Sequence, residues 1–336
     1  MKSELEPETY RAPSWLPGGH LQTILPALYA RRVADAPVTY RRERWHTQDG
    51  DFIDVDFLDG TDPAPGAPIL VLFHGLEGSS RSHYAEAFAD WARAQGLDFA
   101  VPHFRGCSGE INRAPRAYHS GDAQEIDWIL QRMRERQQER GGGPILAAGV
   151  SLGGNALLRW AGEAGHEAAR RVSAVAAICS PLDLAAGGHA IGRGFNRQVY
   201  TRMFLRTMKA KARAKLAQHP GLFDGNQLQA VRDLYAFDDL FTAPLHGFKG
   251  VEDYWRRASA KPLLSSVRVP ALALNARNDP FVPAGSLPRA EEVGHYVTLW
   301  QPAHGGHVGF PQGAAPPGHV RWLPQAVGGW LLRQLG

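Results

Sequence analysis

The sequence predicts an α/β fold in which a mostly parallel central sheet carries helices on both faces and an inserted block of helices. Three observations lead to this fold class. Short apolar segments rich in branched residues alternate with longer segments whose apolar residues recur at helical spacing. The alternation stops between about residues 185 and 260. The glycine-rich motif GVSLGG joins a strand-like segment directly to a helix-like one.

Eight segments have the length and composition of buried strands. Helices are expected in the three amphipathic segments SHYAEAFADWARAQG, DAQEIDWILQRMRERQQ and NALLRWAGEAG. Because strands that alternate with helices usually pair in parallel, these segments predict a sheet covered on both faces. The strand-like segments are residues 38–45, 52–58, 69–75, 97–104, 144–150, 174–180, 271–276 and 296–300.

The interruption after the sixth strand-like segment predicts a helical cap. The 336 residues of the chain exceed the roughly 250–300 residues at which a single core stops growing, so one large domain with an insertion fits best. We expect an N-terminal segment packed on the core (1–36), two parts of the core (37–184 and 261–336) and the cap between them (185–260). The loop GFPQGAAPPGH, residues 309–319, is expected to lack regular structure.

Composition restricts the class of protein. With 44% hydrophobic and 21% charged residues, the chain is typical of a soluble globular protein. Its net charge of +4 is mild and its basic residues are spread out, which argues against nucleic-acid binding. Cys107 and Cys179 match no zinc or disulfide framework, and no segment resembles a signal peptide or a membrane span. We therefore expect a cytoplasmic protein with no metal, no cofactor and no obligate protein partner.

Ser151 lies in the G-x-S-x-G pattern of GVSLGG. Such a short pattern recurs by chance, so its surroundings must decide its meaning. Here a strand-like segment precedes it and a helix-like one follows, which is the arrangement of a nucleophile elbow. Gly149 and Gly153 would let the strand and the helix approach each other. The context favours an activated nucleophile over an incidental serine in a glycine-rich turn.

A serine nucleophile requires a base, and the base requires an acid to orient it. In this kind of fold the chain order is Ser, then Asp or Glu, then His. Asp279 follows the seventh strand-like segment, with Asp183 as the alternative acid. Either His304 or His307, both after the last strand-like segment, could be the base.

The reaction of such a serine also creates an oxyanion, which needs preorganised N–H donors. We expect one donor to be the backbone N–H of Leu152, directly after the serine. The second is expected in the loop HGLEGSSRSHY, with Leu76 as the candidate. A glycine turn into a helix capped by Ser79 or Ser80 explains the same loop, and both interpretations can hold together.

These motifs together resemble the YheT-like family of α/β-hydrolases. The resemblance rests on PSWLPGGHLQTILPAL, HGLEGSSRSHY, FRGCSGEINRAPRAYHSGD, GVSLGGNALLRW, NARNDPF and HGGHVGF, and spans about residues 13–310. It implies the α/β-hydrolase fold, a triad of Ser151, Asp279 and His307, and hydrolysis of carboxylic esters with short to medium acyl chains, or of lipid-like esters, without metal or cofactor.

Four further polar residues lie in these motifs without an assigned chemistry. His20 is expected to be a buried, hydrogen-bonded histidine at a helix start. His103, Arg105 and His119 are expected to fix the loops after a sheet strand.

The segment 193–215 contains eight Lys and Arg residues and no acidic residue. Its apolar residues at near-helical spacing, Phe195, Val199, Met203 and Phe204, predict a cap helix that buries this face and leaves a solvated basic one. The alternative is a surface that contacts anionic lipid or an anionic substrate group. Aromatic residues later in the cap could line an acyl pocket or form its core: Tyr235, Phe237, Phe241, Phe248, Tyr254 and Trp255.

The sequence thus predicts a serine carboxylesterase that acts on a small-molecule ester through an acyl-enzyme. An acyltransferase, a thioesterase or a peptidase would use the same triad. A ligand-binding scaffold without catalysis is the competing class, and it would be expected to have lost a triad member.

Overall fold

Eight strands form one sheet in the computed structural model, which describes residues 10–34, 36–60 and 64–336. The strand order is β1-β2-β4-β3-β5-β6-β7-β8. The pairs β1–β2 and β2–β4 are antiparallel, and the other five pairs are parallel. The predicted fold class is therefore confirmed, and each strand-like segment contains a strand. These are β1 (Tyr40–His46), β2 (Phe52–Leu58), β3 (Ile69–Phe73), β4 (Asp98–Pro102), β5 (Ile145–Val150), β6 (Ala174–Ile178), β7 (Ala271–Leu274) and β8 (Val297–Trp300).

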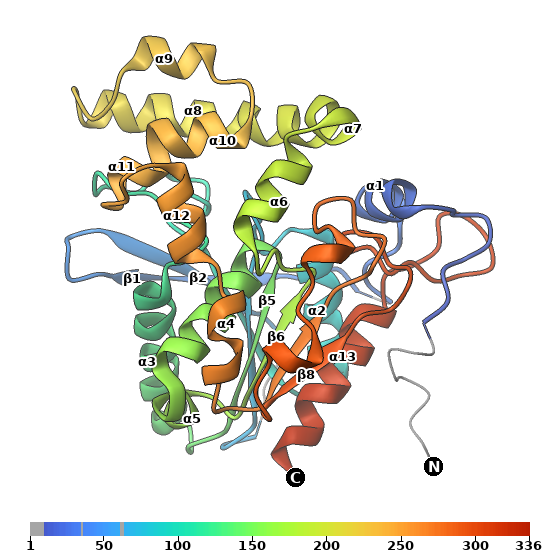
Figure 1. The fold of residues 1–336 in the computed structure, drawn as a ribbon. Coiled ribbons are helices and arrows are strands. Elements are labelled where there is room, and N and C mark those ends of the chain that lie inside the picture. The colour runs from blue at the N-terminus through green and yellow to red at the C-terminus, as the bar shows by residue number, and fades with distance from the viewer. Residues whose placement is uncertain (1–9, 35, 61–63) are drawn as a thin grey trace.

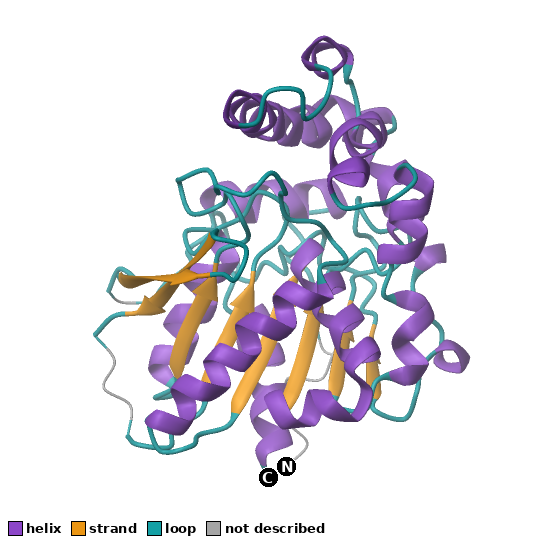
Figure 2. Ribbon diagram, turned by 90° about the vertical axis from the view of Figure 1, so that its left-hand side faces the viewer, coloured by secondary structure: helices purple, strands orange, loops and turns teal. Residues whose placement is uncertain are grey.

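Helices cover both faces of the sheet (Figures 1 and 2). Helices α2 (His83–Ala94) and α13 (Trp322–Leu332) pack on one face, and α3 (Ala123–Glu139) and α4 (Leu152–Ala164) on the other. Successive residues of a strand point to opposite faces, so a strand buried on both sides is apolar throughout. The central strand β3 follows this rule, because all five of its residues are buried.

A layer of further helices lies over the carboxyl ends of the strands, at the top of Figure 1. Between β6 and β7 the chain forms helices and loops without a strand. These helices are α6 (Leu184–Ile191), α7 (Gly194–Asn196), the π-helical turn η3 (Arg197–Thr201), α8 (Arg202–Gln218), α9 (Gly225–Ala230), α10 (Leu234–Phe237), the π-helical turn η4 (Asp238–Thr242), α11 (Ala243–Leu245), α12 (Val251–Ala258) and the 3-10 helix η5 (Lys261–Ser266).

The remaining helices are short, apart from α1 (Gly19–Tyr29), which lies beside the cap and the loop after β8.

Residues 1–9 of the expected N-terminal segment, and residue 35, lie outside the described part of the chain. The loop 309–319 contains only isolated bridges, as expected. Among the described helices, none is both long and apolar enough to cross a membrane. The short helices are α5 (Ala168–Arg171), η2 (Gly165–Glu167), η6 (Ala284–Ser286), η7 (Ala290–Glu292) and η8 (Arg333–Leu335).

The orientation predicted for the segment 193–215 is wrong for three of its four apolar residues. Phe195, Val199 and Met203 are exposed, and only Phe204 packs inward, whereas Leu205 and Ala212 are buried. The π-helical turn η3 holds an extra residue per turn, so side chains on either side of it do not keep α-helical phase. The buried residues Leu205 and Ala212 lie on α8, after this turn.

The basic face of this segment is only partly solvated. The Lys215 side chain is 1% exposed, and its ammonium group donates to the backbone carbonyl of Ala114 at 2.8 Å. Lys211 forms an ion pair with Glu77 at 2.8 Å. Two of the eight basic side chains thus point toward the sheet domain. The pattern of charges alone therefore did not indicate which side of the helix packs inward.

Candidate active site

Ser151 occupies a sharp turn between β5 and α4. Its backbone has φ 53° and ψ −117°, a strained conformation for a residue other than glycine. A Cβ on Gly149 would lie 2.5 Å from the carbonyl oxygen of Gly153, and one on Gly153 would lie 2.5 Å from that of His74. The strand and the helix can approach this closely only because both residues are glycines, so the turn holds the serine hydroxyl above the end of the sheet.

Ser151, His307 and Asp279 form a hydrogen-bonded chain. The Nε2 atom of His307 lies 3.0 Å from Oγ of Ser151, and its Nδ1 atom lies 2.8 Å from Oδ2 of Asp279. Since a carboxylate only accepts, Nδ1–H donates to Asp279, which leaves Nε2 free to accept the serine proton. The second carboxylate oxygen accepts the N–H groups of Phe281 at 2.7 Å and Val282 at 3.3 Å. The acid is therefore fixed in place, and the arrangement is suited to proton abstraction from the serine.

The alternative acid and base have other contacts. Asp183 accepts the backbone N–H of Ala186 at 3.0 Å and caps the start of α6. His304 is exposed, with Nδ1 3.4 Å from the side-chain nitrogen of Asn278. In the described structure neither residue is hydrogen-bonded to Ser151.

The two expected oxyanion donors border the same cavity as Ser151. Leu152 is the first residue of α4, where a backbone N–H has no acceptor within the helix. Leu76 lies in a loop whose backbone is fixed on both sides of it by hydrogen bonds. Tyr84 Oη accepts the N–H of Gly75 at 2.9 Å, and Tyr118 Oη accepts the N–H of Glu77 at 3.0 Å. Among the described residues, no group accepts a hydrogen bond from the N–H of Leu76 or Leu152.

His74 fixes the start of the same loop, a role that the sequence did not indicate. Its Nδ1 lies 2.8 Å from the carbonyl oxygen of Gly75, and its Nε2 lies 3.0 Å from the N–H of Phe104. These partners require a neutral ring that donates from Nδ1 and accepts at Nε2. Complete burial favours the same state, because it lowers the pKa of His74 to about 3.

Helix α1 holds the loop that carries His307. Thr23 Oγ1 accepts the backbone N–H of His307 at 2.8 Å and donates to the carbonyl of Gly19 at 2.7 Å. Gln22 Oε1 accepts the N–H of Gly305 at 3.0 Å and a side-chain N–H of Asn278 at 2.9 Å. In the sequence these two residues belong to the motif PSWLPGGHLQTILPAL, but the motif does not indicate which residues they contact.

We expect Thr23→Val to lower kcat about tenfold on a soluble ester, with KM little changed, because a buried N–H beside His307 loses its acceptor. Thr23→Ser keeps the oxygen and is expected to retain most of the activity. Steady-state kinetics of both variants tests this, with Thr207→Val at an exposed cap position as the matched control. Equal losses in the Val and Ser variants, or a change in KM alone, would contradict a positioning role.

Cys179 contacts the same loop from the end of β6. Its Sγ atom accepts the N–H of Val308 at 3.3 Å, and it is buried. Burial and the charge of Asp279 raise the pKa of this thiol well above its usual range. Both cysteines of the chain are free thiols, and Cys179 serves here as a hydrogen-bonded part of the core.

The other polar residues of the sequence motifs have structural contacts. His20 begins α1 as expected but is half-buried rather than buried, because one side of α1 faces outward; its Nδ1 lies 3.1 Å from Tyr200 Oη. His103 lies 2.9 Å from Asp56, and Arg105 forms ion pairs with Asp49, Asp51 and Glu125. His119 lines the cavity, and burial lowers its pKa to about 3.

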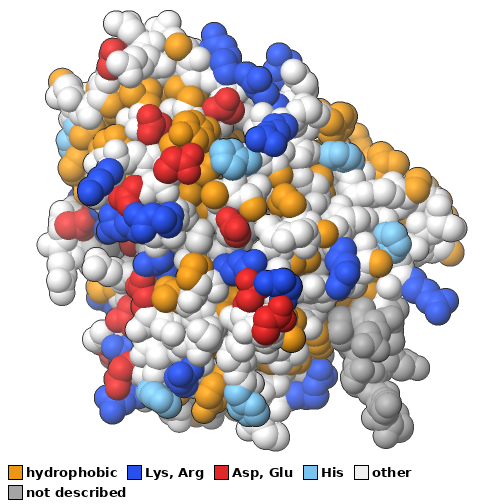
Figure 3. Space-filling model, viewed as in Figure 1, with side chains coloured by type: hydrophobic (Ala, Val, Ile, Leu, Met, Phe, Trp, Pro, Cys, Tyr) orange, Lys and Arg blue, Asp and Glu red, His pale blue; other side chains and the backbone are white. Residues whose placement is uncertain are grey.

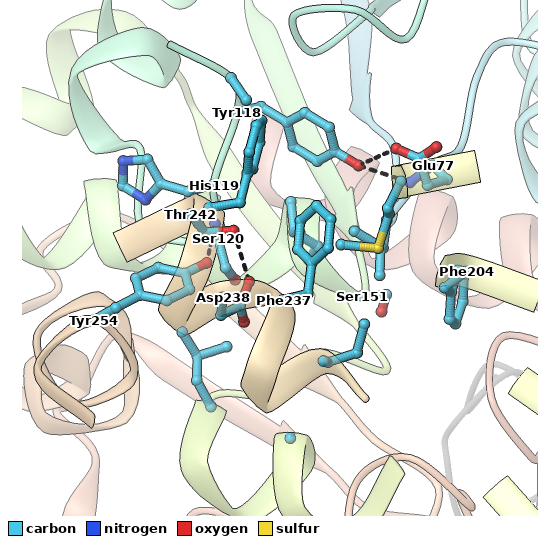
Figure 4. Close-up of a pocket in the computed structure, with 18 of the residues that line it drawn as sticks. Glu77, Tyr118, His119, Ser120, Ser151, Phe204, Phe237, Asp238, Thr242 and Tyr254 are labelled. Carbon is cyan, nitrogen blue, oxygen red and sulfur yellow. Dashed lines mark hydrogen bonds between the residues drawn. The ribbon is translucent and has the colours of Figure 1, made fainter. Parts of the chain in front are cut away.

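A cavity between the cap and the sheet domain opens at Ser151 (Figure 4). Most of its lining is apolar or aromatic. Asp238 is the acidic group on its cap side; it accepts hydrogen bonds from Thr242 and Trp255, and burial raises its pKa to about 6. Of the six aromatic cap residues singled out in the sequence, four line this cavity: Phe237, Phe241, Tyr254 and Trp255.

Comparison with known proteins gives consistent matches. A family model described as alpha/beta hydrolase fold matches residues 68–314. YheT of Escherichia coli strain K12, which is named an esterase, is 40% identical over 318 residues, covering 94% of this chain and 91% of its own. Phospholipase ABHD3 of Mus musculus is 28% identical over 315 residues, covering 92% of this chain and 75% of its own.

The likeness extends to solved structures. Alpha/beta hydrolase domain-containing protein 10 from mouse matches with a TM-score of 0.54 at 14% identity, covering 88% of this chain and all of that one (100%). At such low identity the match concerns the fold alone.

Proposed function

Because this chain belongs to the YheT-like branch of the α/β-hydrolases and is a hydrolase of the esterase and lipase type, we propose that Ser151, His307 and Asp279 are its catalytic triad. In this proposal the enzyme cleaves carboxylic esters through an acyl-enzyme. The observation that carries it is the hydrogen-bonded chain from Ser151 Oγ through His307 to Asp279, at the mouth of an apolar cavity.

The first half of the reaction forms the acyl-enzyme. Ser151 Oγ attacks the ester carbonyl while Nε2 of His307 takes the hydroxyl proton, and Asp279 stabilises the resulting imidazolium. The backbone N–H groups of Leu76 and Leu152 hold the oxyanion. When the tetrahedral intermediate collapses, the bond to the alcohol breaks and the departing oxygen takes the proton from Nε2.

The second half releases the acid. Water attacks the acyl carbonyl and gives its proton to Nε2 of His307, and a second tetrahedral intermediate forms in the same oxyanion site. Its collapse breaks the bond to Ser151 Oγ, which regains its proton from the histidine. Ser151 and His307 thereby return to the protonation states in which they began the cycle.

The cavity supports esters with short to medium acyl chains or lipid-like esters as substrates. Its walls are apolar, and the cap (residues 185–260) supplies many of them, including Phe237 and Trp255. An acyl chain is bound by such a surface through removal of apolar area from water. A relative named phospholipase is consistent with a lipid-like substrate.

A panel of p-nitrophenyl esters from acetyl to palmitoyl tests this function. We expect the highest kcat/KM among butyryl to decanoyl esters, and much lower values for the matched anilide, which has a poorer leaving group. Thioesters of the same acids, and an added alcohol as competing acceptor, separate the thioesterase and acyltransferase alternatives. A preference for thioesters, or transfer to alcohol in place of hydrolysis, would contradict the carboxylesterase proposal.

A further inference from the structure

A group of largely exposed apolar side chains lies on α1 and on the start of the cap. It consists of Leu21 and Leu28 on α1, and Phe195, Val199 and Met203 on α7, η3 and α8. Leu28, Phe195 and Met203 are 60%, 52% and 56% exposed, which is unusual for side chains of this size on adjoining elements. We call these five residues, with the arginines described next, the docking face.

The two elements that carry the docking face are in contact through His20. The ring of His20 on α1 lies 4.5 Å from that of Phe195, and its Nδ1 lies 3.1 Å from Tyr200 Oη in η3. On α1, Leu21 and Leu28 are seven residues apart and so lie on the same side of the helix. The exposed apolar residues therefore form one surface rather than isolated positions.

Four arginines lie on the same cap segment as Phe195, Val199 and Met203: Arg193, Arg197, Arg202 and Arg206. All four are exposed, and within the described structure none forms an ion pair. Many other arginines of the chain do have acidic partners, such as Arg32 with Glu86. In Figure 3 hydrophobic side chains gather on the side where Figure 1 places α1 and α7, with Lys and Arg side chains toward the top.

The docking face lies on the outside of a wall of the candidate active site. In the same stretch of chain, Ile191, Phe204 and Met208 line the cavity that opens at Ser151. The Phe281 ring bridges this wall to the triad, with its centroid 4.5 Å from the Tyr200 ring and 4.2 Å from the His307 ring. A lipid surface in contact with the docking face would thus lie next to the cavity.

We propose that the docking face binds the surface of an anionic lipid bilayer and brings the cavity to lipid esters held there. Exposed apolar residues that insert at the headgroup level, flanked by arginines that pair with anionic headgroups, are the features of an interfacial segment. The absence of any acidic residue from 193 to 215 selects an anionic rather than a neutral surface. The use of bound esters as substrates rests on the proposed function, whereas the binding itself does not.

Vesicle co-sedimentation tests the binding, with phosphatidylcholine vesicles compared with vesicles that also contain phosphatidylglycerol. Wild type is expected to bind the anionic vesicles, and high salt is expected to weaken this binding. A variant with Arg193→Gln, Arg197→Gln, Arg202→Gln and Arg206→Gln, and a second with Phe195→Ser and Met203→Ser, should each bind at least about tenfold more weakly.

A matched control variant removes the same charge outside the cap, through Arg132→Gln, Arg140→Gln, Arg170→Gln and Arg333→Gln, all at exposed positions. It is expected to bind like wild type. Turnover of a soluble short-chain ester, which does not need a bilayer, is expected to stay within about twofold of wild type in all three variants. This readout also shows that the variants are folded.

The docking proposal would be overturned by no binding of wild type to anionic vesicles, by wild-type binding of the four-arginine variant, or by an equal loss in the control. A wild-type dimer in sedimentation velocity that the Phe195→Ser, Met203→Ser variant abolishes, without vesicle binding, would also overturn it and make the face a self-association surface. If wild type binds anionic vesicles but turns over no ester, the proposed function fails and the docking proposal stands.

Discussion

Replacement of Ser151 by alanine is expected to lower kcat/KM for a soluble ester by roughly 10⁶-fold, because the proposed triad would lose its nucleophile and such triads work only as a unit. The same change should abolish labelling by a fluorophosphonate. Intact-mass analysis is expected to find one adduct on wild type and none on Ser151→Ala. The matched control is Ser180→Ala. Ser180 is buried and its Oγ lies close to Gly154 in the elbow, but this hydroxyl donates a hydrogen bond to the carbonyl of Ile178.

Each other outcome has a definite meaning. Folded wild type that takes no adduct would contradict an activated Ser151 and favour the ligand-binding scaffold. An adduct on both wild type and Ser151→Ala would place the reactive nucleophile at another residue. Loss of the adduct in Ser180→Ala as well would show that any change near the elbow is sufficient, so the first result would not identify the nucleophile.

Replacement of His307 by alanine is the second large effect, with an expected loss on the order of 10⁵ to 10⁶-fold in kcat. Nε2 of His307 lies 3.0 Å from Ser151 Oγ, and no other group in the described part of the chain is hydrogen-bonded to this hydroxyl, so the variant lacks a group to take its proton. His304→Ala is the matched control, since it removes an exposed histidine three residues earlier and should leave kcat within about twofold. Steady-state kinetics, with thermal unfolding to verify folding, measures both.

The converse pattern would overturn this assignment. If His304→Ala abolished turnover and His307→Ala left it near normal, the base would be His304. The hydrogen bonds of His307 to Ser151 and Asp279 would then belong to a conformation that does not react. Equal, moderate losses in both variants would indicate that the loop, rather than one ring, matters to the reaction.

The sequence predicted those features that local patterns determine. Most of the eight strands were found because they are short apolar segments between turn residues, and β2 was predicted with its observed ends. The exception is β1, a largely charged edge strand. The elbow was recognisable because strand, glycines and helix are adjacent in the chain. Chain order favoured Asp279 over Asp183, because Asp279 leaves the strand-like segment 296–300 to deliver the histidine. The family resemblance then selected His307 over His304.

What the sequence did not predict depends on contacts between distant segments. Thr23 and His307 are 284 positions apart, and no local pattern relates a threonine on the first helix to the backbone of a loop near the other end. The basic face of 193–215 was predicted to be solvated, and Lys215 departs from this for a similar reason. The carbonyl that accepts from Lys215 belongs to Ala114, 101 residues earlier, so a lysine expected to face solvent is buried.

The hydrogen bond from the His307 backbone to Thr23 also orders events during protein synthesis. Thr23 is translated 284 residues before His307, which follows the last strand of the described sheet, and the two can meet only when that sheet has brought them together. A nascent chain therefore exposes the serine elbow before the proposed base is held in place. On the proposed mechanism, the chain becomes competent for hydrolysis only when α1 has docked on the loop after β8.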